Sequence, residues 1–120
     1  MARVHQCYAR GVDLDVMATL PPSREGLSND QMSEELDLLG PRWQIASSEL
    51  VLVLKDTMTK TGIVAAYAGA LADELDHHPK IVLEYGSMKL AINTHDAKAI
   101  TVMDLVYAAR LEQWLRANHY

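Results

Sequence analysis

The spacing of hydrophobic and polar residues predicts a helix that begins immediately after residue 27. Residues 28–31 read Ser-Asn-Asp-Gln, and a Ser-x-x-Gln capping box satisfies two backbone donors at a helix start. Apolar residues then recur at helical spacing as far as Leu39, which places them on one face. A Gly-Pro pair follows and ends the helix, because proline cannot continue it. The pattern therefore predicts a short amphipathic helix.

Four later stretches have the composition of β-strands and form two pairs. Residues 43–45 and 49–54 are rich in β-branched and aromatic residues, and a pair of serines separates them. Residues 81–85 and 88–94 flank Gly86-Ser87, whose glycine suits the first position of a tight turn. Each pair is therefore predicted to form a β-hairpin.

Two further helices are predicted, one between the hairpins and one near the C-terminal end. The first is capped by Asp56 or Thr59 and carries apolar residues at helical spacing to about Asp76. Pro79 prevents this helix from continuing. The second begins at residues 101–104, Thr-Val-Met-Asp, which form another capping box.

The predicted elements follow the order α-ββ-α-ββ-α. Hairpins followed by helices, without the strand-helix-strand repeat of a parallel sheet, favour an antiparallel sheet covered by helices. We therefore predict an α+β fold, a two-layer sandwich in which a four-stranded antiparallel sheet has its helices on one face. Residues 27–120 form this domain, and residues 1–26, which lack a sustained period, form an N-terminal extension.

Composition narrows the class of protein further. The chain has 11 Lys and Arg against 16 Asp and Glu, and its formal net charge of −5 works against direct binding of nucleic acid. Uncharged runs are too short to span a bilayer, so no membrane segment is expected. The single cysteine, Cys7, cannot form an internal disulfide, which is typical of a reducing compartment. We therefore predict a cytoplasmic protein.

Three histidines stand at the ends of predicted elements. His77 and His78 follow the long helix, and His95 follows the last strand. Imidazole gains and loses protons near neutral pH, so these side chains are candidates for a general acid and a general base. Adjacent histidines at a helix C-terminus also occur because a positive charge is favourable there. Spacing alone leaves both interpretations open.

A metal site is the other chemistry that these histidines suggest, with Asp73, Asp76 or Asp96 as further ligands. Neighbouring residues on one turn point in different directions, unlike a histidine pair at i and i+4. The motif also contains no cysteine that would complete a closed coordination shell. We therefore predict that no metal is bound.

The histidine pair belongs to a longer motif, Asp-Glu-Leu-Asp-His-His-Pro at residues 73–79. Tyr85 follows after five residues, His95 after nine more, and Asp104 after eight more. This spacing resembles the signature of the pterin-4a-carbinolamine dehydratase family. The wider resemblance covers about residues 27–115.

The resemblance implies a hydro-lyase that removes water from 4a-hydroxytetrahydropterin to give quinonoid dihydropterin, in the recycling of tetrahydrobiopterin. It implies no cofactor. It implies catalytic histidines, with the first and third as the acid/base pair and the second mainly holding the pterin: His77, His78 and His95. It implies substrate-binding residues at Asp73, Asp76, Asn93, Thr94 and Asp96. The structural members of the motif are Pro79, Tyr85 and Asp104, and the last also fits the capping box of the final helix.

The resemblance also implies a homodimer or homotetramer, and an aromatic amino-acid hydroxylase as a pathway partner. Relatives act as a dimerisation cofactor of a homeodomain transcription factor and as a RuBisCO assembly factor, so a protein-binding role is the alternative function. Two departures from the family bear on activity. Ile81 stands where many members have tryptophan, and Lys98-Ala99 stands where a glycine usually turns the loop. Neither departure removes an ionisable group of the motif.

Overall fold

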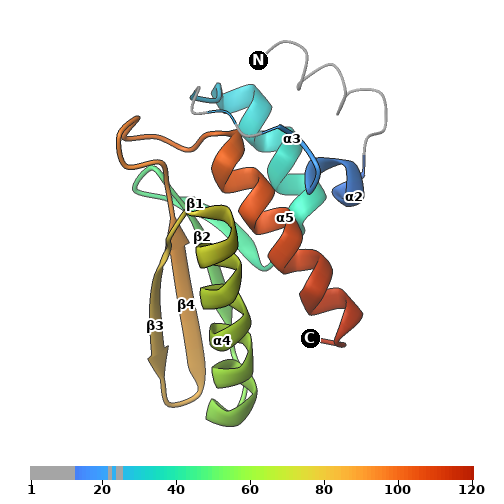
Figure 1. Ribbon diagram of the computed structural model, residues 1–120, viewed down its shortest axis with the longest axis vertical. Coiled ribbons are helices and arrows are strands. Elements are labelled where there is room, and N and C mark those ends of the chain that lie inside the picture. Colours follow the sequence, from blue (N-terminus) through green and yellow to red (C-terminus); the bar gives the residue numbers. More distant parts are fainter. Residues whose placement is uncertain (1–12, 22, 24–25) are drawn as a thin grey trace.

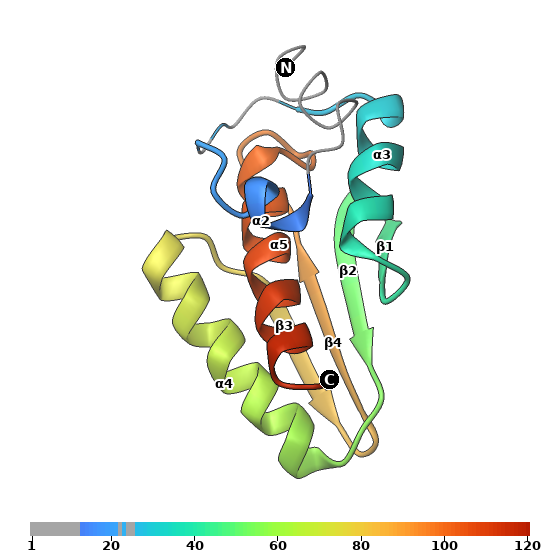
Figure 2. The same cartoon turned by 90° about the vertical axis from the view of Figure 1, so that its right-hand side faces the viewer.

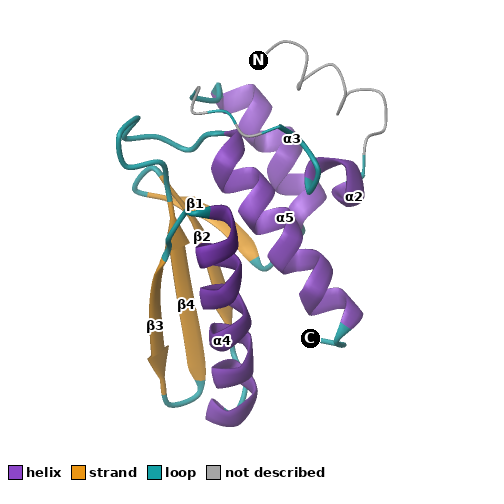
Figure 3. Cartoon of the chain, viewed as in Figure 1, coloured by secondary structure: helices purple, strands orange, loops and turns teal. Residues whose placement is uncertain are grey.

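The computed structural model describes residues 13–21, 23 and 26–120, which form a sheet layer and a helix layer (Figures 1 and 3). The sheet is antiparallel, with four strands in the order β1-β2-β4-β3. The strands are β1 (Trp43–Ala46), β2 (Glu49–Leu54), β3 (Lys80–Glu84) and β4 (Ser87–Ile92). The helices are α2 (Leu14–Met17), α3 (Asn29–Leu39), α4 (Met58–Leu75) and α5 (Val102–Ala117). The predicted α+β class and four-stranded antiparallel sheet are confirmed.

One face of the sheet is buried against the helices, and on the other face only the side chains near the centre are buried. Leu52 of β2 pairs with Leu90 of β4, and both side chains are fully buried. Val82 of β3 pairs with Lys89 of β4, and both are exposed. Because side chains alternate across a strand, this pattern places the helices on a single face of the sheet. Figure 2 shows α5 crossing in front of the strands on that face.

The two hairpins use different turns. Ser47 and Ser48 form the first, with φ values of 53° and 60°, as a type I′ turn requires. In the second hairpin Glu84 pairs with Ser87, so Tyr85 and Gly86 are the turn residues. Gly86, with φ of 81°, is therefore the second of them. The prediction that this glycine takes the first position is wrong, because Tyr85 leaves the strand and enters the turn.

Capping side chains fix where the helices begin. The predicted capping box at Ser28 is present at the start of α3. Thr57, rather than Asp56 or Thr59, caps α4, and its hydroxyl accepts the N–H of Lys60 at 3.3 Å. Asp56 instead accepts the N–H of Thr57 at 2.7 Å, one position before the cap. Asp56 therefore orders the cap residue without being the cap itself.

Buried polar side chains join α5 to the other elements. Tyr107 donates its hydroxyl to the Ala68 carbonyl of α4 at 2.6 Å, and burial raises the pKa of this phenol. Glu112, 1% exposed, accepts the indole N–H of Trp43 at 2.9 Å. Its carboxylate also lies 2.9 Å from Nε of Arg42. These contacts fix the orientation of α5 relative to α4 and to the first strand.

Part of the predicted N-terminal extension contributes to the core. The short helix α2 packs against α5, and Leu14, Met17 and Ala18 are buried. Four residues are too few for a helical period to show in the sequence. Residues 1–12, 22 and 24–25, and with them Cys7, lie outside the described residues. The domain boundary at residue 26 stays a prediction.

Candidate active site

The segments that carry the three histidines lie at one end of the sheet. After α4 the chain turns at Asp76, which has left-handed φ and ψ values of 50° and 46°. Lys80, at the start of β3, pairs with Ala91, near the end of β4. The segment before β3 and the loop after β4 therefore lie side by side, at the upper end of the sheet in Figure 1. The first segment contains His77 and His78, and the second contains His95.

His77 is held by a buried carboxylate. Its Nε2 lies 2.5 Å from Oδ1 of Asp104, in the first turn of α5. The His77 side chain is 11% exposed and the Asp104 side chain is fully buried. An ionised carboxylate only accepts hydrogen bonds, so with Asp104 ionised the hydrogen of this bond is on Nε2 of His77, and the tautomer of the neutral imidazole that fits has its lone pair on Nδ1. Asp104 thus sets both the tautomer and the orientation of His77.

The second oxygen of Asp104 has two further donors. Oδ2 accepts the backbone N–H of Thr101 at 2.8 Å and the hydroxyl of Thr94 at 2.9 Å. The first of these bonds closes the capping box at the start of α5. Asp104 therefore both caps the start of α5 and holds His77. The bond to His77 has no local sequence signal, because the two residues are 27 positions apart.

His78 has an exposed partner at the end of α4. Its Nε2 lies 3.0 Å from Oδ1 of Asp73, and the two side chains are 57% and 82% exposed. Water screens such a pair, so it contributes little to the stability of the fold. It does orient the His78 ring at the rim of the site. Asp76, also exposed, is the C-cap residue of the same helix.

The loop after β4 forms a closed turn. β4 ends at Ile92, two residues before the predicted end of that strand. Thr94 then bridges to Ala99, with its N–H donating to the Ala99 carbonyl at 2.9 Å. Lys98 adopts a φ of 51° and so turns the loop where no glycine is available. The loop therefore closes with a lysine at the position of left-handed φ.

The remaining predicted residues differ in exposure and position. His95 and Asp96 are exposed on this turn, and Asn93 is half-buried at its base. Thr94 is only 1% exposed, and its hydroxyl faces other protein groups. Tyr85 is 97% exposed in the β3–β4 turn, at the opposite end of the sheet from the histidines. Within one chain, Tyr85 therefore does not join the site.

The hollow beside His77 is small. It has a volume of about 30 Å³, and its other walls are Leu75, Met103 and Val106. Sites that enclose small organic ligands usually offer about 300 Å³ or more. A single copy of the chain therefore presents the histidines on an open surface rather than in an enclosed pocket.

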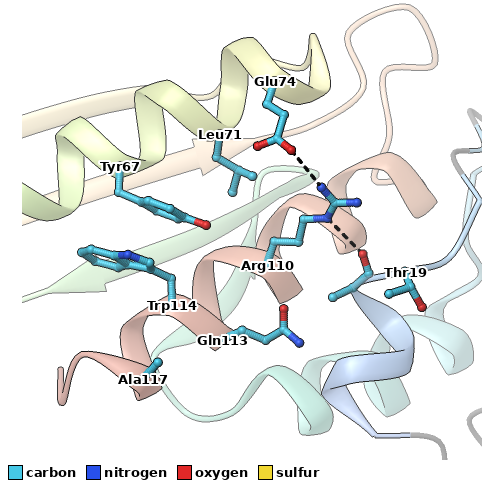
Figure 4. A pocket seen from close by; sticks show the side chains of 9 residues that line it. Thr19, Tyr67, Leu71, Glu74, Arg110, Gln113, Trp114 and Ala117 are labelled. Carbon is cyan, nitrogen blue, oxygen red and sulfur yellow. Dashed lines mark hydrogen bonds and ion pairs between the residues drawn. The ribbon is translucent and has the colours of Figure 1, made fainter.

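A larger hollow of about 430 Å³ lies between α2, α4 and α5, and none of the predicted site residues lines it (Figure 4). Arg110 donates from Nε to the Ala18 carbonyl at 3.1 Å, and its Nη1 lies 3.7 Å from Glu74. Gln113, on its wall, donates to Asp15 at 2.6 Å. These contacts hold the three helices together. The hollow contains no histidine, so acid/base chemistry near neutral pH is better placed at the end of the sheet.

The described ranges of the chain contain neither a candidate metal cluster nor a helix that could span a membrane. Among those residues, no group of three His, Cys, Asp or Glu side chains is arranged to hold a metal ion. In the same ranges, every helix is too short or too polar to cross a membrane.

Comparison with known proteins identifies the class that the fold and the motif define. A solved structure from Brucella melitensis, named transcriptional coactivator/pterin dehydratase, superposes with a TM-score of 0.69 at 24% identity. The match covers 74% of this chain and 97% of that one, and it shows a shared fold. The sequence profile of the family described as "Pterin 4 alpha carbinolamine dehydratase" matches residues 25–114. The chain belongs to the pterin-4a-carbinolamine dehydratase family.

Individual relatives agree with this assignment. A protein of Chlorobium luteolum is 35% identical over 99 residues, which is 78% of this chain and 82% of that protein. A protein of Chloroflexus aurantiacus is 30% identical over 88 residues, which is 72% of this chain and 94% of that protein. Both are named "Putative pterin-4-alpha-carbinolamine dehydratase". The matches cover nearly all of each relative, so the resemblance concerns the whole domain.

Proposed function

We propose that this protein is a 4a-hydroxytetrahydropterin dehydratase that acts by histidine general acid/base catalysis. The observation that carries the proposal is the His77–Asp104 pair, at the end of the sheet where His78 and His95 also lie. Membership of the dehydratase family supports the reaction class. The names of the relatives support a pterin as the substrate.

The reaction breaks the bond between C4a and its hydroxyl oxygen and removes a proton from a ring nitrogen. An acid must therefore reach the hydroxyl, and a base must reach the ring N–H. His77 is the better base, because Nε2 donates to Asp104 and Nδ1 keeps the lone pair. His95, exposed on its loop, donates the other proton, so that the hydroxyl leaves as water. Exchange with solvent then returns both imidazoles to their starting states.

We assign binding of the pterin to exposed polar groups around the histidines. A pterin presents an amino group and ring N–H donors, which carboxylates and amide oxygens accept. Groups of this kind surround the histidines in the segment before β3 and in the loop after β4: Asp73, Asp76, Asn93 and Asp96. His78, oriented by Asp73, supplies a ring at the same rim.

We propose that two copies of the chain join at β3, an edge strand of the sheet. Antiparallel pairing of two such strands about Val82 sets Lys80 of one copy opposite Glu84 of the other. Val82 and Leu83 are 36% and 40% exposed in one copy, and pairing would cover them. The charges and the apolar residues of this strand therefore suit a homodimer.

This pairing also accounts for the exposed tyrosine of the motif. Tyr85 follows Glu84, so in the dimer it would lie beside Pro79 of the other copy, next to His78. It would supply an aromatic wall to a site that has Ile81 on its own strand and only a small hollow beside His77. Ile63 and Ala66 on the exposed face of α4 suit a further pairing of dimers into a homotetramer.

The proposal is tested by following the ultraviolet absorbance of enzymatically generated 4a-hydroxytetrahydropterin. The wild type should accelerate its decay, and the double variant His77→Ala with His95→Ala should not. The matched control is His119→Ala, which removes an exposed histidine outside the motif. Full activity in the double variant would exclude the histidines as the acid and the base.

A protein-binding role is a second candidate, favoured by one observation. The similar structure from Brucella melitensis carries the words transcriptional coactivator beside pterin dehydratase in its name. Such a role would predict a stable complex, with a transcription factor or an assembly client, that survives loss of both histidines. A pull-down with the double histidine variant tests it, and loss of the complex in that variant would count against it.

The cellular setting is also part of the proposal. We place the protein in the cytoplasm, because one cysteine in the whole chain is typical of a reducing compartment. An aromatic amino-acid hydroxylase is the expected source of the carbinolamine substrate. No cofactor is required, because loss of water needs two proton transfers and cleavage of the C4a–O bond, and neither an oxidant nor a reductant takes part.

A further inference from the structure

The hydroxyl of Thr94 lies at the centre of a buried hydrogen-bond chain. Its Oγ1 is 2.9 Å from Oδ2 of Asp104 and 2.6 Å from Oγ1 of Thr101. Both threonines are at most 1% exposed, so water does not compete for these bonds. In turn, Oγ1 of Thr101 accepts the backbone N–H of Met103 at 3.2 Å. The series of bonds begins at the Met103 N–H in α5 and ends at Asp104, which holds His77.

The direction of each bond in this chain follows from the donor inventory. An ionised carboxylate cannot donate, so the Thr94 hydroxyl gives its only proton to Asp104. Thr94 must then accept the proton that Thr101 donates. Asp104 receives Thr94 and the Thr101 backbone on Oδ2, which leaves Oδ1 to accept Nε2–H of His77. Every hydrogen bond in this series is therefore donated towards Asp104. This arrangement favours the single tautomer of His77 that has its hydrogen on Nε2.

The backbone of Thr94 belongs to the loop that carries His95. Its N–H donates to Ala99 at 2.9 Å, and the Lys98 N–H donates to the carbonyl of His95 at 3.2 Å, which closes the turn between them. The side chain and the backbone of one residue therefore connect the Asp104–His77 pair to the His95 loop.

We infer that Thr94 is a positioning residue rather than a contact for the pterin. Through Asp104 and through its own backbone, it fixes the position of His77 relative to the loop that carries His95. This inference rests on the proposed dehydratase function. It predicts that removal of the hydroxyl lowers kcat and leaves KM nearly unchanged, because the pterin never touches it. A direct contact with substrate would instead raise KM.

The test compares Thr94→Val, which keeps the shape and removes the hydroxyl, with Thr94→Ser, which keeps the hydroxyl. We expect kcat to fall about tenfold or more in Thr94→Val, as for other residues that orient a functional imidazole, and to recover in Thr94→Ser. The matched control is Thr61→Val, at a fully buried threonine whose hydroxyl donates to the Thr57 carbonyl in α4. This control should lower stability but leave kcat unchanged.

A second measurement does not depend on activity. Long-range proton–nitrogen NMR spectra report which imidazole nitrogen of His77 carries the hydrogen. The wild type should show Nε2–H alone, and Thr94→Val should show a mixture with Nδ1–H. If the wild type has no dehydratase activity, the proposed function fails while the tautomer still tests the role of Thr94.

Three results would overturn the inference. One is a wild-type His77 with its hydrogen on Nδ1, which decides the matter even if Thr94→Val does not fold. Another is a single, unchanged tautomer in Thr94→Val. The third is a raised KM with unchanged kcat, which would return Thr94 to the substrate-binding residues.

Discussion

His77 and Asp104 form a hydrogen bond of 2.5 Å between Nε2 and Oδ1, and this bond joins the end of α4 to the start of α5. The carboxylate is fully buried, while the imidazole keeps 11% of its surface exposed. Asp104 thus holds the imidazole from inside the protein, and the exposed edge of the His77 ring can reach a ligand. His77 is therefore held in one orientation and still has exposed surface for a substrate.

Asp104→Asn should lower kcat by roughly a hundredfold or more, because the amide can donate to His77 and stabilise the wrong tautomer. The asparagine oxygen can still accept the Thr101 N–H, so the start of α5 should stay intact. Steady-state kinetics with circular dichroism checks both points. The control is Asp30→Asn, the same change in the first turn of α3. An unchanged kcat in Asp104→Asn would remove Asp104 from the mechanism.

Glu112→Ala should lower the free energy of unfolding by about 1–3 kcal/mol, because it leaves the buried indole N–H of Trp43 without its acceptor. Glu112 accepts from Trp43 at 2.9 Å and from Nε of Arg116 at 2.8 Å, and it pairs with Arg42. Urea unfolding measures the change. Glu74→Ala provides the comparison, because its pair with an arginine is long and exposed and should contribute less than about 1 kcal/mol. Equal losses in the two variants would contradict this account.

Glu35 should make the stability of the protein depend on pH. It is fully buried in α3, neither carboxyl oxygen has a hydrogen-bond partner, and burial, with a smaller effect of Glu34, raises its pKa from 4.5 to about 8. The folded chain therefore keeps a proton that the unfolded chain loses. The contribution of Glu35 to the free energy of unfolding is therefore fully present below pH 4.5 and is lost as the pH rises towards 8. The slope should reach at most ~1.4 kcal/mol per pH unit.

Urea unfolding at several pH values between 5 and 8 measures this slope. Glu35→Gln should flatten the dependence, and Glu35→Leu should also raise stability at neutral pH because no proton has to be taken up on folding. Asp37→Asn, at an exposed position of the same helix, is the control and should leave the slope unchanged. A slope that survives in Glu35→Gln would show that another group is responsible.

The sequence predicts most elements because their signals are local. The capping boxes at Ser28 and Thr101 each act within four residues, and both are present in the structure. The position of the Thr94 hydroxyl depends instead on how β4 and α5 meet, and no local pattern reports it. In the same way, Glu35 follows another glutamate in an amphipathic helix and looks like a surface residue, although it is fully buried.

The motif identifies candidate site residues by their spacing, but its members do not all lie together in one chain. It places the histidine segments together because the register of β3 and β4 follows from the hairpin between them. Tyr85 shows the limit of this reasoning, since it belongs to the same motif as His78 but stands at the other end of the strand. A sequence motif records spacing along one chain and contains no information about a second copy.

The proposed dimer predicts the effect of reversing charges on β3. Lys80→Glu should set like charges opposite each other across the two strands and raise the dissociation constant about tenfold or more. Adding Glu84→Lys should restore the opposite charges and the dimer. Sedimentation equilibrium measures the mass of each variant. A wild type with the mass of one chain at micromolar concentration would exclude this dimer, and a double variant that stays dissociated would exclude this register.

We propose that this chain dehydrates a pterin carbinolamine with its own histidines. The most direct test is the decay rate of freshly generated 4a-hydroxytetrahydropterin with the wild type and with His95→Ala, at equal concentrations and neutral pH. We predict acceleration by the wild type and a decay close to the uncatalysed rate with His95→Ala. No acceleration by the wild type would contradict the claim, and equal acceleration by both would show that His95 is not the acid.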